Sequence, residues 1–172
     1  MTKKRIAVTG GCGFIGRNLV NGFVDAGYDV TVLDIAEQAF RDDVTFLNID
    51  IRDKQAVIDA CADMDSLIHN ASIVITKQVL KQMVWDVNHG GTLNLIEACK
   101  VHQIPKMVYI SSASAVYEGK DIENGDETLP YSSISQADYA DSKIHAEKDA
   151  LAFSGTGPTT VCAIRPHVVF GP

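Results

Sequence analysis

The chain has 172 residues, 46% of them hydrophobic, which is enough for one domain with a sizeable core. Its formal net charge of −7 at pH 7 argues against nucleic acid as a partner, because phosphate contacts need clustered Lys and Arg. No apolar run approaches the roughly 20 residues of a membrane span, so we expect no integral membrane segment.

The four cysteines form no CxxC pair and have no histidine at metal-ligand spacing: Cys12, Cys61, Cys99 and Cys162. We therefore expect reduced thiols and no metal site. The charged stretch after Met1 is unlike a signal peptide. Together these features predict a cytoplasmic protein.

The first predicted element is a strand over residues 5–9 that runs through a glycine-rich turn into a helix. Three glycines spaced three apart are typical of a dinucleotide-binding turn. Gly10 permits the tight turn, Gly13 lets the backbone approach a pyrophosphate, and Gly16 lets the helix pack against the strand. Phe14 opens the helix, whose free N–H groups and partial positive charge favour phosphate.

The second predicted strand covers residues 28–33 and ends at Asp34, 18 positions after Gly16. An acidic side chain at this distance can accept hydrogen bonds from both ribose hydroxyls of an adenosine. It would repel a 2′-phosphate, and the following Ile35 and Ala36 provide no arginine for one. The sequence therefore favours NAD over NADP.

A third predicted strand covers residues 44–49 and is followed by Asp50 and Ile51. These two residues lie where ligands of parallel sheets bind, and we interpret them as an acceptor for the adenine amine and an apolar wall. Asp53 is positioned to cap a helix that runs to Cys61.

The fourth predicted strand, residues 66–72, ends in small residues that suit close passage of a cofactor: Asn70, Ala71 and Ser72. His69 is assigned no chemistry. A variable stretch over residues 73–87 precedes a long helix over residues 88–101, and a fifth strand covers residues 107–110.

Residues 117–136 are polar and rich in turn residues, which predicts a loop. A final helix over residues 137–153 and a strand over residues 159–164 follow. Because strands and helices alternate throughout, the sequence predicts an α/β fold with a doubly wound, mostly parallel sheet and the strand order 3-2-1-4-5-6.

A phenol and an amine lie four residues apart in the final predicted helix, as Tyr139 and Lys143, which puts both on one helix face. A phenol is a poor base at neutral pH, but a cation beside it favours the phenolate. Tyr139 can then exchange a proton with a substrate alcohol or carbonyl, and Lys143 can also bind the ribose of a nicotinamide. Glu147 is expected to pair with Lys143 or a neighbour at the surface.

A hydroxyl group at the end of the fifth strand would complete this catalytic set by hydrogen bonding to the reacting oxygen. Three serines are placed to provide it: Ser111, Ser112 and Ser114. The residues alone leave the choice between them open.

Taken in order, these motifs resemble those of the extended short-chain dehydrogenase/reductases, a family that includes NAD-dependent epimerases and dehydratases. The matching positions extend over essentially the whole chain: Thr9-Gly10-x-x-Gly13-x-x-Gly16, Asp34, Asp50-Ile51, His69-Asn70-Ala71-Ser72, Asn88-x-x-Gly91-Thr92, Ser111-Ser112, Tyr139-x-x-x-Lys143 and Arg165-Pro166. The resemblance implies a Rossmann fold, an NAD cofactor and a Ser, Tyr and Lys catalytic set.

Within this family the chain is most similar to the 3β-hydroxysteroid and sterol-4-carboxylate 3-dehydrogenases. The segments that carry this similarity are residues 111–119, 121–125, 137–139 and 165–167. By resemblance, Ser112 is the catalytic serine, and Asn88 helps to order the nicotinamide end of the cofactor.

The expected catalytic residues are Ser112, Tyr139 and Lys143. The expected cofactor-binding residues are Gly10, Gly13, Phe14, Ile15, Gly16, Asp34, Asp50, Ile51, Asn70, Ala71, Ser72, Asn88, Tyr139, Lys143 and Pro166.

Extended members of the family continue past the position of Pro172 into a smaller substrate-binding region. We therefore expect residues 1–172 to form an NAD(P)-binding Rossmann domain that lacks this region. In the family the helices that contain Asn88 and Tyr139 form a four-helix contact, so the resemblance also implies a possible homodimer.

Three functions remain open at this point. The first is NAD-dependent hydride transfer to or from a secondary alcohol or ketone, with a 3β-hydroxysteroid or sterol-like compound as the small-molecule substrate. The second is a nucleotide-sugar 4-epimerase or dehydratase of the same family. The third is an NAD-binding module or sensor without turnover in this form.

Overall fold

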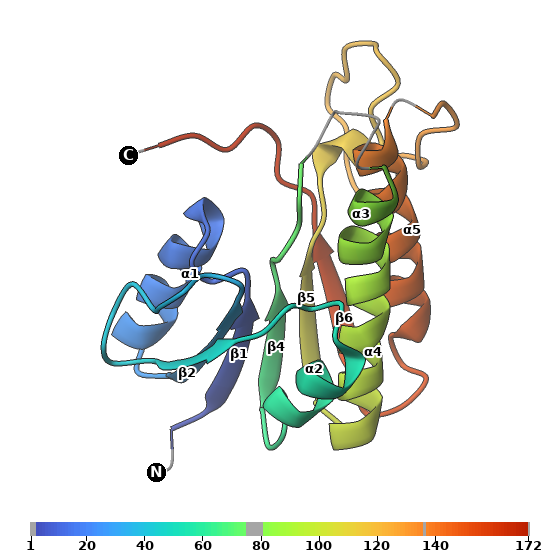
Figure 1. Ribbon diagram of the computed structural model, residues 1–172. Coiled ribbons are helices and arrows are strands. Elements are labelled where there is room, and N and C mark those ends of the chain that lie inside the picture. Colours follow the sequence, from blue (N-terminus) through green and yellow to red (C-terminus); the bar gives the residue numbers. More distant parts are fainter. Residues whose placement is uncertain (1–2, 75–80, 136, 172) are drawn as a thin grey trace.

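The computed structural model describes residues 3–74, 81–135 and 137–171 and contains a six-stranded sheet (Figure 1). The strands are β1 (Arg5–Thr9), β2 (Asp29–Asp34), β3 (Thr45–Asn48), β4 (Ser66–His69), β5 (Lys106–Ile110) and β6 (Thr160–Ile164). Their order is β3-β2-β1-β4-β5-β6, and all neighbouring strands are parallel. This confirms the predicted doubly wound Rossmann fold and its strand order.

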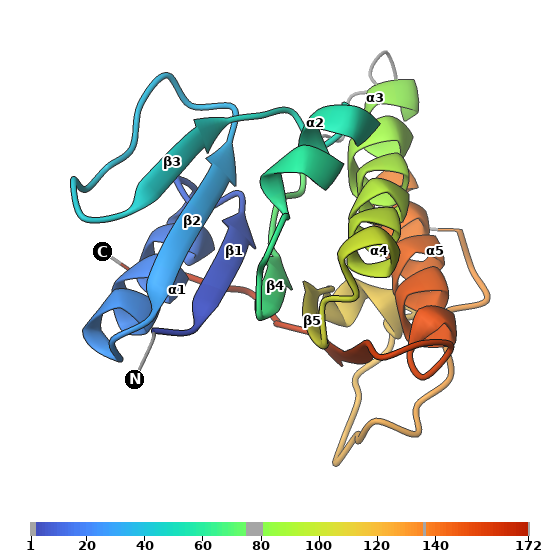
Figure 2. The ribbon, with the colours of Figure 1, turned by 90° about the horizontal axis from the view of Figure 1, so that it is seen from below.

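The helices lie on both faces of the sheet. They are α1 (Phe14–Asp25), α2 (Lys54–Ala60), α3 (Lys81–Trp85), the π-helix η2 (Asp86–Gly90), α4 (Gly91–His102), the 3-10 helix η3 (Ala113–Ala115) and α5 (Asp138–Phe153). Helix α1 packs against β1 and β2, whereas α2 and α5 pack against α4 on the opposite face (Figure 2).

The hydrophobic core is divided by the sheet, because successive strand residues point to opposite faces. Ile6 and Val8 of β1 join Val20 of α1 in one cluster. Ala7, between them in sequence, joins the larger cluster with Leu95 of α4. Both faces of β1 are therefore buried, as is typical of a central parallel strand.

The glycine turn has the geometry that its spacing predicts. Gly10 has φ +64°, a conformation that side chains disfavour. A Cβ atom at Gly16 would lie 2.0 Å from the carbonyl oxygen of Gly10, so only glycine allows α1 to pack this closely against the turn. Gly27, with φ +86°, follows the end of α1 as predicted.

The predicted boundary of the long helix before β5 was wrong. The sequence placed a variable stretch up to Val87, but α3, η2 and α4 follow one another without a break from Lys81 to His102. Gly90 and Gly91 weaken the helical signal there. A Cβ atom at Gly91 would lie 2.4 Å from Cδ1 of Ile51, so Ile51 would have to move to accept one. Residues 75–80 of the predicted stretch lie outside the described residues.

The fourth strand was predicted to run to residue 72, but β4 ends at His69. A predicted helix cap and a predicted loop agree with the structure. Asp53 caps α2, with its carboxylate accepting a hydrogen bond from the Ala56 N–H at 3.1 Å. The described residues of the predicted loop between Tyr117 and Gln136 contain no helix or strand. Within the described ranges, every helix is too short or too polar to cross a membrane.

Two glycines of α1 give a matched test of the packing at the turn. Gly16→Ala is expected to lower the free energy of unfolding by more than about 2 kcal/mol, because the Cβ atom collides with backbone. Gly22→Ala in the same helix meets no atom within 4 Å, so it is expected to raise that free energy by about 0.5 to 1 kcal/mol. Urea denaturation of both variants measures the difference, and equal effects would contradict this account of the turn.

Candidate functional site

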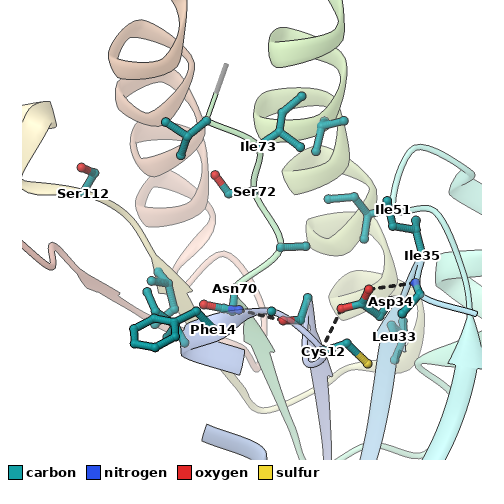
Figure 3. Close-up of a pocket in the computed structure, with 18 of the residues that line it drawn as sticks. Cys12, Phe14, Leu33, Asp34, Ile35, Ile51, Asn70, Ser72, Ile73 and Ser112 are labelled. Carbon is teal, nitrogen blue, oxygen red and sulfur yellow. Dashed lines mark hydrogen bonds between the residues drawn. The ribbon is translucent and has the colours of Figure 1, made fainter. Parts of the chain in front are cut away.

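A cleft of about 760 Å³ lies at the carboxyl ends of the strands. It runs from the glycine turn after β1 to the first turns of α5 (Figure 3). Strand β1 lies between β2 and β4, so the chain direction across the sheet reverses here. Open parallel sheets bind ligands at such a reversal point.

The cleft gathers most of the residues that the sequence singled out. Those that line it are Gly10, Gly13, Phe14, Ile15, Asp34, Asp50, Ile51, Asn70, Ala71, Ser72, Ser112, Tyr139, Lys143 and Pro166. Two further predicted residues, Gly16 and Asn88, are buried next to the cleft and do not line it. Ile73, Met83 and Val87 also line it and were not expected, because they fall in the stretch that was predicted to be variable.

At one end of the cleft, Asp34 is fixed by two backbone N–H groups. Its carboxylate accepts hydrogen bonds from the N–H of Cys12 at 2.9 Å and from the N–H of Ala36 at 3.0 Å (Figure 3). These contacts join the end of β2 to the glycine turn. Each carboxylate oxygen retains a further acceptor position, so the group can still bind two ribose hydroxyls.

Asp50 and Ile51 border the same end of the cleft. The guanidinium group of Arg52 hydrogen bonds to the carboxylate of Asp50 and lowers the pKa of that carboxyl group. Ile51 is 5% exposed and packs against Gly91. Asp50 is therefore an ionised acceptor that is already paired, and Ile51 is part of the core as well as of the cleft wall.

The middle of the cleft has room for a phosphate next to free N–H groups. A Cβ atom at Gly13 would meet only the Gly10 carbonyl oxygen, at 3.3 Å, so this side of the turn faces open space. Gly13 also caps α1 without a side chain, and the first backbone bond of the helix runs from Arg17 to Gly13. The N–H groups before Arg17 are left for an anionic ligand.

The segment after β4 closes the floor of the cleft. The backbone N–H groups of Asn70 and Ala71 donate to the Thr9 hydroxyl at 3.1 and 3.0 Å, and the Asn70 amide donates to the Gly10 carbonyl at 3.1 Å. The hydroxyl oxygen of Ser72 is shielded from solvent and has no hydrogen-bond partner within the described part of the chain. A buried hydroxyl without a partner is costly, so this group is available for a ligand.

His69 connects three elements beside the cleft through its two ring nitrogens. Its ring nitrogens lie 3.0 Å from the Thr9 hydroxyl and 2.8 Å from the Thr92 hydroxyl. Burial and, to a smaller extent, the charge of Lys143 lower the pKa of His69 to about 3. The imidazole is therefore neutral and links β1, β4 and α4.

At the other end of the cleft, α5 carries Tyr139 and Lys143 on the face that lines it. Lys143 is 2% exposed, and its ammonium group donates a hydrogen bond to the Ile110 carbonyl at 2.5 Å and lies 4.4 Å from the centre of the Tyr109 ring. Burial lowers the pKa of Lys143 to about 7, and the carboxylate of Glu147 partly opposes this shift.

The three candidate serines differ in their hydrogen bonds. Ser111 donates to the buried carboxylate of Glu147 at 2.5 Å, so its hydroxyl proton is committed. Ser114 donates to the Ser112 hydroxyl at 2.9 Å. Ser112 lines the cleft and accepts both this bond and one from the Ser114 N–H at 3.2 Å. Its own proton is free to point at a ligand.

Two residues behind the cleft were interpreted incompletely from sequence. Asn88 is 1% exposed, and its amide bonds to the backbone N–H and carbonyl of Ile73 and to the Ser142 hydroxyl. It can order the cofactor only through Ile73. Glu147 was expected at the surface, which is wrong: it is 1% exposed and forms an ion pair with Arg165 at 2.7 Å.

A model of the 3-beta hydroxysteroid dehydrogenase/isomerase family matches residues 7–172. The chain belongs to this family. Membership confirms the resemblance to extended short-chain dehydrogenase/reductases that the sequence motifs indicated.

Individual relatives agree with this assignment. The chain is 37% identical to a decarboxylating sterol-4-alpha-carboxylate 3-dehydrogenase of Bos taurus, covering 98% of this chain and 48% of that protein. It is 36% identical to a 3 beta-hydroxysteroid dehydrogenase/Delta 5→4-isomerase of Mycobacterium tuberculosis, covering 97% and 47%. The chain thus spans about half the length of these relatives.

Solved structures share the fold over about half of their own length. A Thermus thermophilus UDP-glucose 4-epimerase in complex with NAD is 30% identical with a TM-score of 0.81, over 94% of this chain and 54% of that one. An NAD-bound short-chain dehydrogenase/reductase superfamily protein of Agrobacterium tumefaciens has a TM-score of 0.85 at 21% identity, over 94% and 48%.

The neutral imidazole of His69 predicts a distinct pH dependence of stability. Between the folded pKa of about 3 and the ordinary value of 6.5, the unfolded chain binds the proton and the folded chain does not. Stability is therefore lost as the pH falls from 6.5 towards 3, by up to about 1.4 kcal/mol per pH unit from this residue.

His69→Gln is expected to lower stability at pH 7.5 but to remove most of this slope between pH 6.5 and 5. His167→Gln, at an exposed position, is the matched control and is expected to keep the slope. Urea denaturation across this pH range measures both. An unchanged slope in His69→Gln would contradict a neutral, buried His69.

Proposed function

We propose that residues 1–172 form the cofactor-binding and catalytic domain of an NAD-dependent oxidoreductase. The reaction is hydride transfer between nicotinamide and a secondary alcohol or ketone, and the substrate is a 3β-hydroxysteroid or sterol-like compound. The observation that carries this proposal is that a single cleft is lined by the glycine turn, Asp34, Ser112, Tyr139 and Lys143. The relatives named above support the substrate class.

The residues present fit an NAD molecule along the cleft. Asp34 would accept the ribose hydroxyls of the adenosine, and the N–H groups of the glycine turn would bind the pyrophosphate. The hydroxyl of Ser72 lies between these two ends and lacks a partner within the described ranges. Lys143 uses one of its three donors on Ile110, which leaves two for the ribose of the nicotinamide.

When bound, NAD supplies the atom that accepts or returns the hydride. In oxidation, Tyr139 as a phenolate takes the hydroxyl proton of the alcohol, and Ser112 donates a hydrogen bond to the same oxygen. Lys143 lies one helical turn from Tyr139, and both line the cleft. In reduction, Tyr139 returns the proton.

A preference for NAD over NADP is part of the proposal. The carboxylate of Asp34 is held towards the ribose position by two backbone N–H groups, so it cannot easily turn away from a 2′-phosphate. Ile35 and Ala36, which line the cleft beside it, offer no positive charge. Like-charge repulsion therefore disfavours NADP at this end of the cleft.

A nucleotide-sugar 4-epimerase or dehydratase is a second candidate, favoured by the 30% identity to the epimerase structure. Such an enzyme would use the same three groups but return the hydride within each turnover, so it would release no NADH. An NAD-binding module or sensor is a third candidate and would bind NADH without any turnover.

The unpaired thiols suit a reducing compartment, and we place the protein in the cytoplasm. Cys61 and Cys99 are buried in one cluster without forming a disulfide.

A homodimer through α4 and α5 is also proposed, because Leu93 and Leu151 leave apolar surface exposed on these helices. A sedimentation mass of two chains would support the dimer, and a mass of one chain would contradict it.

Tyr139→Phe tests the proposed chemistry. Turnover of 3β-hydroxysteroids with NAD, measured in the complete polypeptide that contains this chain, is expected to fall by about 10²- to 10⁴-fold, because the proton acceptor is lost. The affinity for NADH, measured by fluorescence titration, is expected to stay within about threefold. NADPH is expected to bind more weakly than NADH.

Tyr28→Phe is the matched control, because it removes the same hydroxyl from a ring that packs against Phe23 away from the cleft. It is expected to keep both turnover and NADH affinity. Unchanged turnover in Tyr139→Phe would refute the role of Tyr139. NADH binding with no turnover of steroids or nucleotide sugars would favour the sensor.

A further inference from the structure

A buried carboxylate lies one helical turn beyond Lys143 on α5. Glu147 is 1% exposed, although ionisable groups are rarely this buried unless they are paired. The proposed chemistry does not use it. A position on a solvated helix face therefore does not explain why this carboxylate is buried.

The carboxylate of Glu147 receives hydrogen bonds from three other segments of the chain. Ser111, at the end of β5, donates to one oxygen at 2.5 Å. Arg165, at the end of β6, donates to the other oxygen from Nε at 2.9 Å and is ion-paired through Nη2 at 2.7 Å. Tyr131, in the loop before α5, donates from its hydroxyl at 3.1 Å.

Two of these segments, those of Ser111 and Arg165, lead directly into the reacting end of the cleft. Ser111 precedes Ser112, and Arg165 precedes Pro166, whose carbonyl accepts a hydrogen bond from the Ala113 N–H at 2.9 Å. Ser112 and Pro166 both line the cleft. One carboxylate thus joins the ends of β5 and β6 to the helix that carries Tyr139 and Lys143.

We propose that Glu147 is a positioning residue of the site. Its carboxylate holds the Ser112 segment at a fixed distance from Tyr139 and Lys143 on α5, and its negative charge balances the buried ammonium of Lys143. The catalytic consequence rests on the proposed function, whereas the structural tie and the charge balance do not.

The groups around Lys143 make Glu147 its main electrostatic partner. The Tyr109 ring and the Ile110 carbonyl face the ammonium from β5, and neutral His69 lies on the β4 side. Tyr139 and Glu147 belong to α5 itself. Among the described residues, Glu147 is the charged group that raises the pKa of Lys143 against the effect of burial.

Arg165 pairs with the buried carboxylate of Glu147 and so offsets the cost of burying it. This pairing does not cancel the attraction between Glu147 and Lys143. Its side chain is 22% exposed and its ring-facing side stacks on Tyr131, with 5.0 Å between the guanidinium carbon and the ring centre. Part of its positive charge is therefore hydrated. Glu147 therefore interacts with two cations. Arg165 is partly hydrated and Lys143 is buried, so the charge of Glu147 has the larger electrostatic effect on Lys143.

Glu147→Gln tests the charge, because the amide is nearly the same size as the carboxylate. Titration of Lys143 is followed by NMR of the Cε and Hε signals in lysine-labelled protein, with Lys143→Met for assignment. Its midpoint is expected to fall by about one pH unit in Glu147→Gln. Asp149→Asn, which removes an exposed charge from the same helix, is the matched control and is expected to leave the midpoint unchanged.

Glu147→Asp tests the position, because it keeps the charge and shortens the reach to Ser111 and Arg165. The Lys143 midpoint is expected to stay at its original value, while kcat of the complete enzyme falls and the basic limb of its pH profile does not move. In Glu147→Gln that limb is expected to move to lower pH together with the NMR midpoint.

An unchanged Lys143 midpoint in Glu147→Gln would overturn the charge balance. If Glu147→Gln does not fold, a midpoint in Glu147→Asp that falls by about one pH unit would overturn it instead. An undiminished kcat in Glu147→Asp would overturn the positioning role. The NMR titration needs no turnover, so the absence of dehydrogenase activity in the unaltered protein would refute the proposed function and leave this result intact.

Discussion

The ammonium of Lys143 is bonded to the carbonyl of Ile110 inside the protein, and this contact fixes α5 over the end of β5. Tyr139, one turn earlier on the same helix face, is thereby placed in the cleft. Burying an ammonium is costly unless it is paired. The carbonyl, the Tyr109 ring and the charge of Glu147 offset that cost together, so α5 cannot shift without leaving a buried charge unpaired.

The cofactor end of the cleft rests on a different constraint, the close packing of α1 against the glycine turn. The two ends are joined by a short chain of buried polar groups. The Thr9 hydroxyl receives the N–H groups of Asn70 and Ala71 and contacts His69, which in turn contacts Thr92 of α4. Buried polar contacts through neutral His69 therefore link the end of β1 to α4.

Much of this arrangement could be predicted from the sequence because the signals are local. Glycine spacing, the acidic residue after β2 and the i, i+4 pair of Tyr139 and Lys143 each depend on one turn or one helix. The alternation of strands and helices then led to the correct strand order. The residues alone left the choice among the three serines open, and only the family resemblance favoured Ser112. The contact that engages the Ser111 hydroxyl comes from Glu147, 36 positions further along the chain.

The errors arose where distant segments meet. Glu147 lies four residues after Lys143, a spacing that is compatible with a solvated or a buried side chain. The sequence does not show that the ends of β5 and β6 contact this side chain. Asn88 has a polar side chain of a type that often binds ligands. In the structure it lies in the π-helix η2, and its amide bonds to the backbone of Ile73. The helical residues from Lys81 to Val87 were missed because the sequence assigned them to a variable stretch.

The central claim is that one cleft brings a dinucleotide from the glycine turn to Tyr139. A crystal structure of the chain with NADH tests it most directly. The account predicts the adenosine ribose on the Asp34 carboxylate and the nicotinamide ring within hydrogen-bonding reach of a substrate oxygen placed between Tyr139 and Ser112. A nicotinamide ring directed away from Tyr139, or NADH bound outside this cleft, would contradict it.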